Sequence, residues 1–190
     1  MERLSGLDAS FLHMETPTMH THVVGVLLLD TSDMPGGYSF ERVRALIENR
    51  MHLIPPFRRR LVTVPMNLDH PVWIEDPDFD LDAHLYRIGA PPPGGMRELA
   101  EITGDIAGRP LDRARPLWEM WVIEGLADDR VALVTKIHHS AIDGVSGADI
   151  MANLFDLERD APGPAPPDDY DAWKPDEVPS GWALIRDGLT

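Results

Sequence analysis

Two extended apolar segments, 117–124 and 131–138, are separated by the short connection 125–130. A connection of this length joins neighbouring antiparallel strands, because parallel strands need a crossover of about a dozen residues or more. The two segments therefore predict a β-hairpin with a longer loop. Such a hairpin is incompatible with a purely parallel, doubly wound sheet, so we expect a mixed or antiparallel sheet.

Helices are expected to flank this sheet. Apolar residues recur with the helical period after Ser39, a favourable N-cap, and helical patterns also occupy 96–107 and 143–155. The runs 23–29 and 131–137 are continuously apolar, which is typical of strands covered on both faces. Short strands are expected at 60–64 and 72–75. The fold class is therefore α/β, of the α+β type, with a mixed sheet flanked by helices.

The composition excludes several classes of function. The chain of 190 residues carries 17 Lys and Arg against 32 Asp and Glu, a net charge of −15, so it lacks the basic surface that nonspecific nucleic-acid binding requires. It contains no cysteine, which excludes disulfides and thiolate catalysis. Its longest apolar run is far shorter than the ~20 residues that cross a bilayer. The N-terminus has neither the basic n-region nor the apolar h-region of a signal peptide, so no signal peptide is expected.

Residues 158–179 differ in composition from the rest of the chain. They are rich in proline and aspartate, which predicts an extended, solvated linker. We therefore expect a domain at 1–157 and a linker at 158–179. Residues 180–190 are expected to begin a helix that leads to an absent C-terminal domain.

The segment 138–144, His-His-Ser-Ala-Ile-Asp-Gly, stands where a predicted strand ends and a predicted helix begins. A histidine with an ordinary pKa near 6.5 is a natural general base. Neighbouring side chains of an extended chain point to opposite sides, so only one of His138 and His139 can face a given cavity. Asp143 is placed to cap the helix or to orient the loop. Gly144 leaves room for a close backbone or ligand approach.

Other chemistries fit these residues less well. His139 and Asp143 are four residues apart, but they straddle a turn and have no third ligand nearby in the sequence. His20 and His22 could chelate a metal from one side of an extended segment, yet they too lack a sequence neighbour as a third ligand. We therefore predict no metal. Ser140 adjoins His139, and no Gly-x-Ser-x-Gly nucleophile motif is present, which argues against a serine triad.

Four stretches together resemble the bacterial wax ester synthase/diacylglycerol acyltransferase family. The pattern His-His-x-x-x-Asp-Gly is the signature of the wider coenzyme A-dependent acyltransferase superfamily, which includes chloramphenicol acetyltransferase-like enzymes and peptide condensation domains. The three further stretches are similar to this family in particular and occur in its order. They are 4–12 (LSGLDASFL), 55–58 (PPFR) and 116–120 (PLWEM).

The resemblance implies a chloramphenicol acetyltransferase-like half domain, one of two that enclose a tunnel. It implies that His139 takes the proton of an alcohol attacking the thioester of acyl-CoA, while His138 is a buried, hydrogen-bonded orienter. Asp143 would hold the loop, and Gly144 would keep the tunnel open. Acyl-CoA is a substrate in this scheme, and no cofactor is implied. Three residues are expected to pack in the core, with acyl-chain contact as the alternative role: Pro116, Leu117 and Trp118.

The resemblance also implies substrates and location. The acyl acceptor would be diacylglycerol, giving triacylglycerol, with long-chain alcohols and wax esters as a second activity. The C-terminal half of the same protein would be the partner, and the enzyme would be cytoplasmic, in peripheral contact with membranes or lipid droplets. Two alternatives stay open: a condensation-type domain that uses carrier-bound acyl groups, and a non-catalytic acyl-binding half domain.

Overall fold

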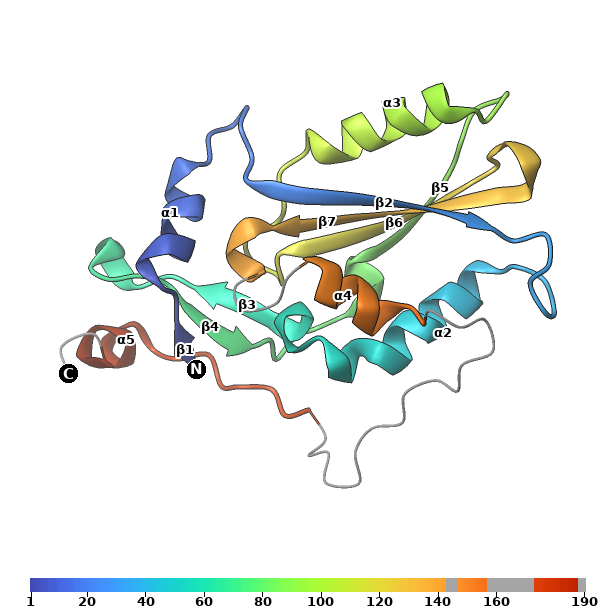
Figure 1. Ribbon diagram of the computed structural model, residues 1–190. Helices are drawn as coiled ribbons and strands as arrows, with labels where there is room; N and C mark the ends of the chain where they lie inside the picture. Colours follow the sequence, from blue (N-terminus) through green and yellow to red (C-terminus); the bar gives the residue numbers. More distant parts are fainter. Residues whose placement is uncertain (143–146, 157–172, 188–190) are drawn as a thin grey trace.

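The computed structural model describes residues 1–142, 147–156 and 173–187 of the chain (Figure 1). The strands are β1 (Glu2–Arg3), β2 (His22–Asp30), β3 (Arg59–Val62), β4 (Val72–Glu75), β5 (Leu85–Gly89), β6 (Trp118–Glu124) and β7 (Arg130–His138). The α-helices are α1 (Gly6–Met14), α2 (Phe40–Arg50), α3 (Met96–Ala107), α4 (Gly147–Leu154) and α5 (Gly181–Asp187). A 3₁₀ turn, η6 (His139–Ala141), follows β7 directly.

The larger sheet has four strands in the order β2-β7-β6-β5. The pairs β2–β7 and β6–β7 are antiparallel, and β5–β6 is parallel. The predicted hairpin and the mixed sheet are therefore both confirmed. The register places His22 opposite His138, so the start of β2 lies beside the end of β7.

Helices cover both faces of this sheet. Helix α3 packs on one face through Leu99 and Ile106, which contact Val134 and its buried neighbours. Helices α2 and α4 cover the other face, with Ile47 and Leu154 in a second core (Figure 1). Helix α2 begins after Ser39, whose hydroxyl accepts the N–H of Arg42, and α3 has the bounds that the sequence pattern predicts.

A smaller sheet, in the order β1-β4-β3, lies beside α1 and α5. Leu184 of α5 packs against Val64 and Val72 of this region. Of the predicted linker, the structure describes only 173–179. There the indole Nε1–H of Trp173 donates to Glu75 Oε2 over 2.8 Å. The first described residue of this segment thus contacts β4. Among the described helices, none has the length and apolar character needed to cross a bilayer.

One expectation for the strands is wrong. Strand β2 was expected to be covered on both faces, but in the described residues three of its apolar side chains are exposed, and the strand lies at the edge of the sheet. Val23 is 40% exposed, Val26 48% and Leu28 36%. Continuous apolarity identifies a strand that needs cover, while its place at the edge is set by tertiary pairing. Strand β7 lies inside the sheet and is buried along its length except at Arg130, as expected.

Candidate active site

The four sequence stretches of the family resemblance meet at the end of β7. His138 N–H donates to the carbonyl oxygen of Leu117 over 2.9 Å. The indole Nε1–H of Trp118 in turn donates to the carbonyl oxygen of Phe57 over 2.8 Å. Helix α1, from the first stretch, packs against η6, where Phe11 contacts His139. Segments that are distant in sequence therefore surround one turn.

His138 is buried, with 1% exposure, and is held at both ring nitrogens. The N–H of Ser140 donates to Nδ1 over 3.1 Å, so the neutral ring carries its proton on Nε2. Nε2 lies 3.1 Å from Thr21 Oγ1, whose hydroxyl donates to the carbonyl oxygen of Phe11. Burial lowers the pKa of His138. Its ring is therefore a fixed, neutral part of the turn.

His139 has the opposite environment. Its side chain is exposed, and its ring stacks on Phe11 with centroids 4.0 Å apart and an interplanar angle of 21°. Its backbone N–H donates to the carbonyl oxygen of Thr21 over 2.8 Å. The backbone is thus fixed while the ring stays accessible, which is the arrangement that a general base for an external hydroxyl needs.

Three supporting residues escaped the sequence analysis: Glu15, Thr21 and Arg113. Thr21 touches both histidines, and its N–H donates to Glu15 Oε1 over 3.0 Å. Arg113 donates to Glu15 Oε2 over 2.7 Å. Burial raises the pKa of Glu15, but the hydrogen bonds from Arg113 and Thr21 outweigh it, so the pKa is lowered. Thr21 stands between His20 and His22 in the sequence, and this pattern could have drawn attention to it. No sequence pattern marks Arg113 as a residue of the site.

Pro116, Leu117 and Trp118 are all buried. Trp118 is 1% exposed and lies between the rings of Phe57 and His84, with centroid distances of 4.4 and 4.6 Å. Leu117 is 0% exposed. The three residues pack the start of β6 into the core, and this placement favours the packing role over contact with an acyl chain.

The remaining predicted residues are placed differently. Asp143 and Gly144 lie outside the described residues, so the predicted roles of both stay predictions. Ser140 is buried, and its hydroxyl lies 2.7 Å from His138 Nδ1, which makes it part of the turn. A hollow beside the turn is lined by residues from three of the four stretches, among them Ser5, Asp8, Pro56, Ser140 and Ala141.

Comparisons with known proteins agree with this geometry. A sequence model of the wax ester synthase/diacylglycerol acyltransferase catalytic domain matches residues 4–184. A protein of Mycobacterium tuberculosis (strain H37Rv), provisionally named a diacylglycerol O-acyltransferase, is 56% identical over 167 residues, which cover 87% of this chain and 33% of that protein. Another from that strain, with the same provisional name, is 45% identical and is covered to 39%.

Solved structures show the same fold. The wax ester synthase/diacylglycerol acyltransferase from Marinobacter aquaeolei VT8 aligns with a TM-score of 0.65 and 36% identity, covering 79% of this chain and 37% of that chain. The starter condensation domain of rhizomide synthetase RzmA aligns with a TM-score of 0.59 at 12% identity, over 80% of this chain and 37% of that one, and shows the shared fold alone. The chain spans between 33% and 39% of the length of the relatives described. It belongs to the wax ester synthase/diacylglycerol acyltransferase family.

Proposed function

We propose that the protein containing this chain transfers an acyl group from acyl-CoA to the hydroxyl of diacylglycerol, with long-chain alcohols as second acceptors. The observation that carries the proposal is the contrast within the histidine pair. His138 is buried and hydrogen-bonded at both ring nitrogens, while His139 is exposed on a backbone fixed by Thr21. Membership of the family supplies the acyl chemistry.

In the proposed reaction His139 removes the proton of the acceptor hydroxyl as the oxygen attacks the thioester carbonyl carbon. The carbon–sulfur bond breaks, the ester forms, and coenzyme A leaves as a thiolate that takes up the proton. Base and substrates are positioned together, so no covalent acyl-enzyme is required. Asp143 would hold the loop after η6, Gly144 would leave space for substrate, and acyl-CoA would enter as a substrate without any cofactor.

We infer that a C-terminal half of the same protein completes the site. The support is twofold: the relatives described are more than twice as long, and β2 exposes Val23, Val26 and Leu28 along the edge of the sheet. Val26 and Leu28 lie on one face of the sheet and Val23 on the other, and exposed apolar side chains on an edge strand are a surface that proteins usually cover. We propose domain limits of 1–157 and a linker at 158–179 for this arrangement.

Diacylglycerol resides in lipid, and this suggests where the enzyme works. We propose that it acts from the cytoplasm in peripheral contact with a membrane or lipid-droplet surface. Flotation of the full-length protein with diacylglycerol-containing vesicles tests this part separately from the chemistry.

Product analysis tests the proposed activity. The full-length enzyme is given labelled palmitoyl-CoA with diacylglycerol, with hexadecanol, or with neither acceptor, and the labelled esters are identified. We expect triacylglycerol in the first reaction and a smaller yield of wax ester in the second. Transfer only from carrier-bound acyl groups would support the condensation-type alternative. Binding of acyl-CoA without any ester would support a non-catalytic domain.

A further inference from the structure

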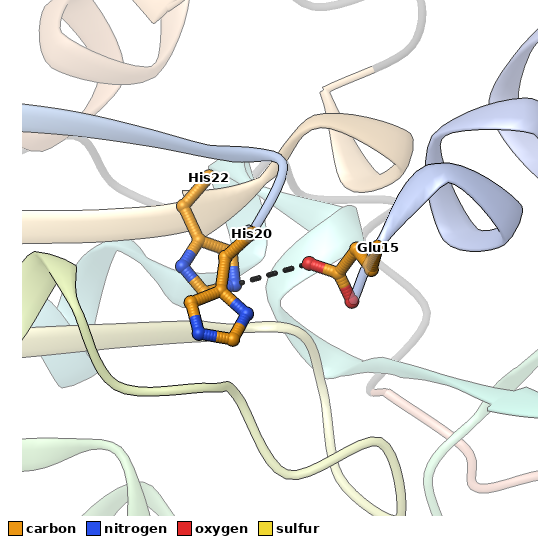
Figure 2. A group of neighbouring side chains, drawn as sticks. All are labelled: Glu15, His20 and His22. Carbon is orange, nitrogen blue, oxygen red and sulfur yellow. Dashed lines mark ion pairs between the residues drawn. The ribbon is translucent and has the colours of Figure 1, made fainter. Parts of the chain in front are cut away.

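Glu15, His20 and His22 come together at the corner where α1 leads into β2 (Figure 2). A ligand-type atom from each residue lies within 4.8 Å of those from the other two. Nε2 of His22 is 3.5 Å from Oε1 of Glu15. The fold therefore brings to the two histidines the third ligand that they lack among their neighbours in the sequence.

His22 has a buried ring without hydrogen bonds. Its side chain is 3% exposed, and neither Nδ1 nor Nε2 has a hydrogen-bond partner. Buried polar groups in native proteins are nearly always satisfied, so this ring needs an explanation. Imidazole nitrogens without another partner are common ligands of transition-metal ions.

The geometry of the histidine pair suits chelation. Residues i and i+2 of an extended chain project to the same side, and the rings of His20 and His22 stack with centroids 5.1 Å apart and an interplanar angle of 10°. Two imidazoles and one carboxylate are a recurrent three-ligand set for zinc. Ligand atoms of a tetrahedral zinc ion lie about 3.4 Å apart, so the three ligand atoms need to approach one another by at most about 1.4 Å, which side-chain rotation can supply.

The surrounding charges leave one carboxylate oxygen directed to the histidines. Arg113 donates to Oε2 of Glu15, and Lys136 is paired with Glu119 at 3.0 Å. Oε1 accepts the N–H of Thr21 over 3.0 Å, and a carboxylate oxygen has a further lone pair for an ion. Nε2 of His138 is 3.3 Å from Oε1, but it also has Thr21 Oγ1 at 3.1 Å as an acceptor. His138 therefore keeps a partner when Oε1 turns to an ion.

We propose that Glu15, His20 and His22 form a binding site for a zinc-type divalent transition-metal ion, with water in a fourth position. Thr21 lies between the two histidine ligands and contacts both His138 and His139. An ion at this corner would clamp the segment that positions the histidine pair. The site shares Glu15 with the surroundings of His138, but its existence does not depend on the proposed acyl transfer.

Metal binding to the full-length protein tests the site directly. Protein freed of metal by chelator and without an affinity tag is titrated with Zn²⁺ by calorimetry, and with Mg²⁺ as a comparison. We expect one tightly bound Zn²⁺ per chain and no comparable binding of Mg²⁺. His20→Asn should weaken zinc binding at least about tenfold, because a direct ligand is lost. The control His13→Asn, at an exposed position of α1, should bind zinc as the wild type does.

His22→Asn should also weaken zinc binding, but it changes a buried residue, and further measurements keep the result decisive if this variant does not fold. Because His20 is partly exposed, the His20→Asn variant is expected to fold, and circular dichroism checks this. In the wild type, Zn²⁺ should shift the ring resonances of His20 and His22 but not those of His13. Equal zinc affinity in the wild type and His20→Asn would overturn the proposal, as would a wild type that binds no zinc.

Discussion

The ring of Phe11 lies on the ring of His139, with centroids 4.0 Å apart. The contact joins the first family stretch, 4–12, to the histidine segment, although more than a hundred residues separate them in the chain. Phe11 is half-buried on α1, and its carbonyl oxygen accepts the hydroxyl of Thr21. The stack limits the positions that the otherwise exposed ring of His139 can take.

Removing the stack should therefore affect catalysis more than folding. We expect Phe11→Ala in the full-length enzyme to lower kcat by roughly 10- to 100-fold, because an ångström of misplacement of a base costs about that much. The KM for acyl-CoA should change less. Leu7→Ala is the matched control, since Leu7 lies on the same helix and is 69% exposed. Equal losses in both variants would argue against a role for the stack.

Substitution of Trp118 should affect the enzyme mainly by lowering its free energy of unfolding. Trp118→Ala removes a buried indole and its hydrogen bond to the carbonyl oxygen of Phe57, at a cost of about 3–5 kcal/mol. Denaturant unfolding measures this loss. Trp182, which is 83% exposed, provides the control: Trp182→Ala should cost less than about 0.5 kcal/mol. A Trp118→Phe enzyme of wild-type stability but altered acyl-chain preference would instead indicate substrate contact.

The lowered pKa of His22 predicts that the stability of the metal-free protein depends on pH. Its pKa is about 4 in the folded chain and near 6.5 when unfolded, so between these values the unfolded state binds more protons. Stability is therefore complete above pH 6.5 and falls as the pH is lowered toward 4. The contribution lost by pH 5 is roughly 2 kcal/mol.

Thermal unfolding in chelator at pH 7 and pH 5 measures this effect. His22→Gln should reduce the drop in the unfolding midpoint between the two pH values. The lowered pKa of His138 also reduces stability as the pH falls, and this effect is present in both the wild type and His22→Gln. A drop as large in His22→Gln as in the wild type would show that other groups produce it.

Residues 1–190 alone should not catalyse acyl transfer, because the site is proposed to need a second wall. Mixing them with a separately expressed C-terminal half should restore ester formation from palmitoyl-CoA. Val26→Lys on β2 should weaken this restoration, whereas Leu68→Lys, at a residue 61% exposed between β3 and β4, should not. Robust turnover by 1–190 alone would contradict the two-half arrangement.

The parts of the fold that the sequence predicts are those with strong local signals. The β6–β7 hairpin has two apolar runs and a short connection, and α3 has a clear apolar face bounded by Gly95 and Gly108. Helix α1 was missed because its capping by Ser5 leads into a weakly periodic sequence. Strand β5 was missed because it is short and its sequence, with Tyr86 and Arg87 at the centre, has no clear apolar pattern. Its parallel pairing with β6 is a long-range contact.

The site shows the same division between local and long-range signals. His138 and His139 are evident in the sequence, because an adjacent pair before Asp-Gly is unusual. Glu15 and Arg113 are not, since they reach the end of β7 only where α1 packs beside the connection between α3 and β6. The third ligand of the proposed metal site was missed for this reason as well.

The assignment of the base to His139 is the central claim, and comparison of two variants tests it most directly. Steady-state turnover of the full-length enzyme is measured with palmitoyl-CoA and diacylglycerol for His139→Ala and His138→Ala, after circular dichroism has shown that both are folded. We expect His139→Ala to lose roughly 100- to 10,000-fold in kcat with unchanged stability. His138→Ala should lose less activity and more stability, because the buried Ser140 N–H loses its acceptor and Thr21 Oγ1 loses the contact with the ring. If His138→Ala is the less active of two well-folded enzymes, the assignment is reversed.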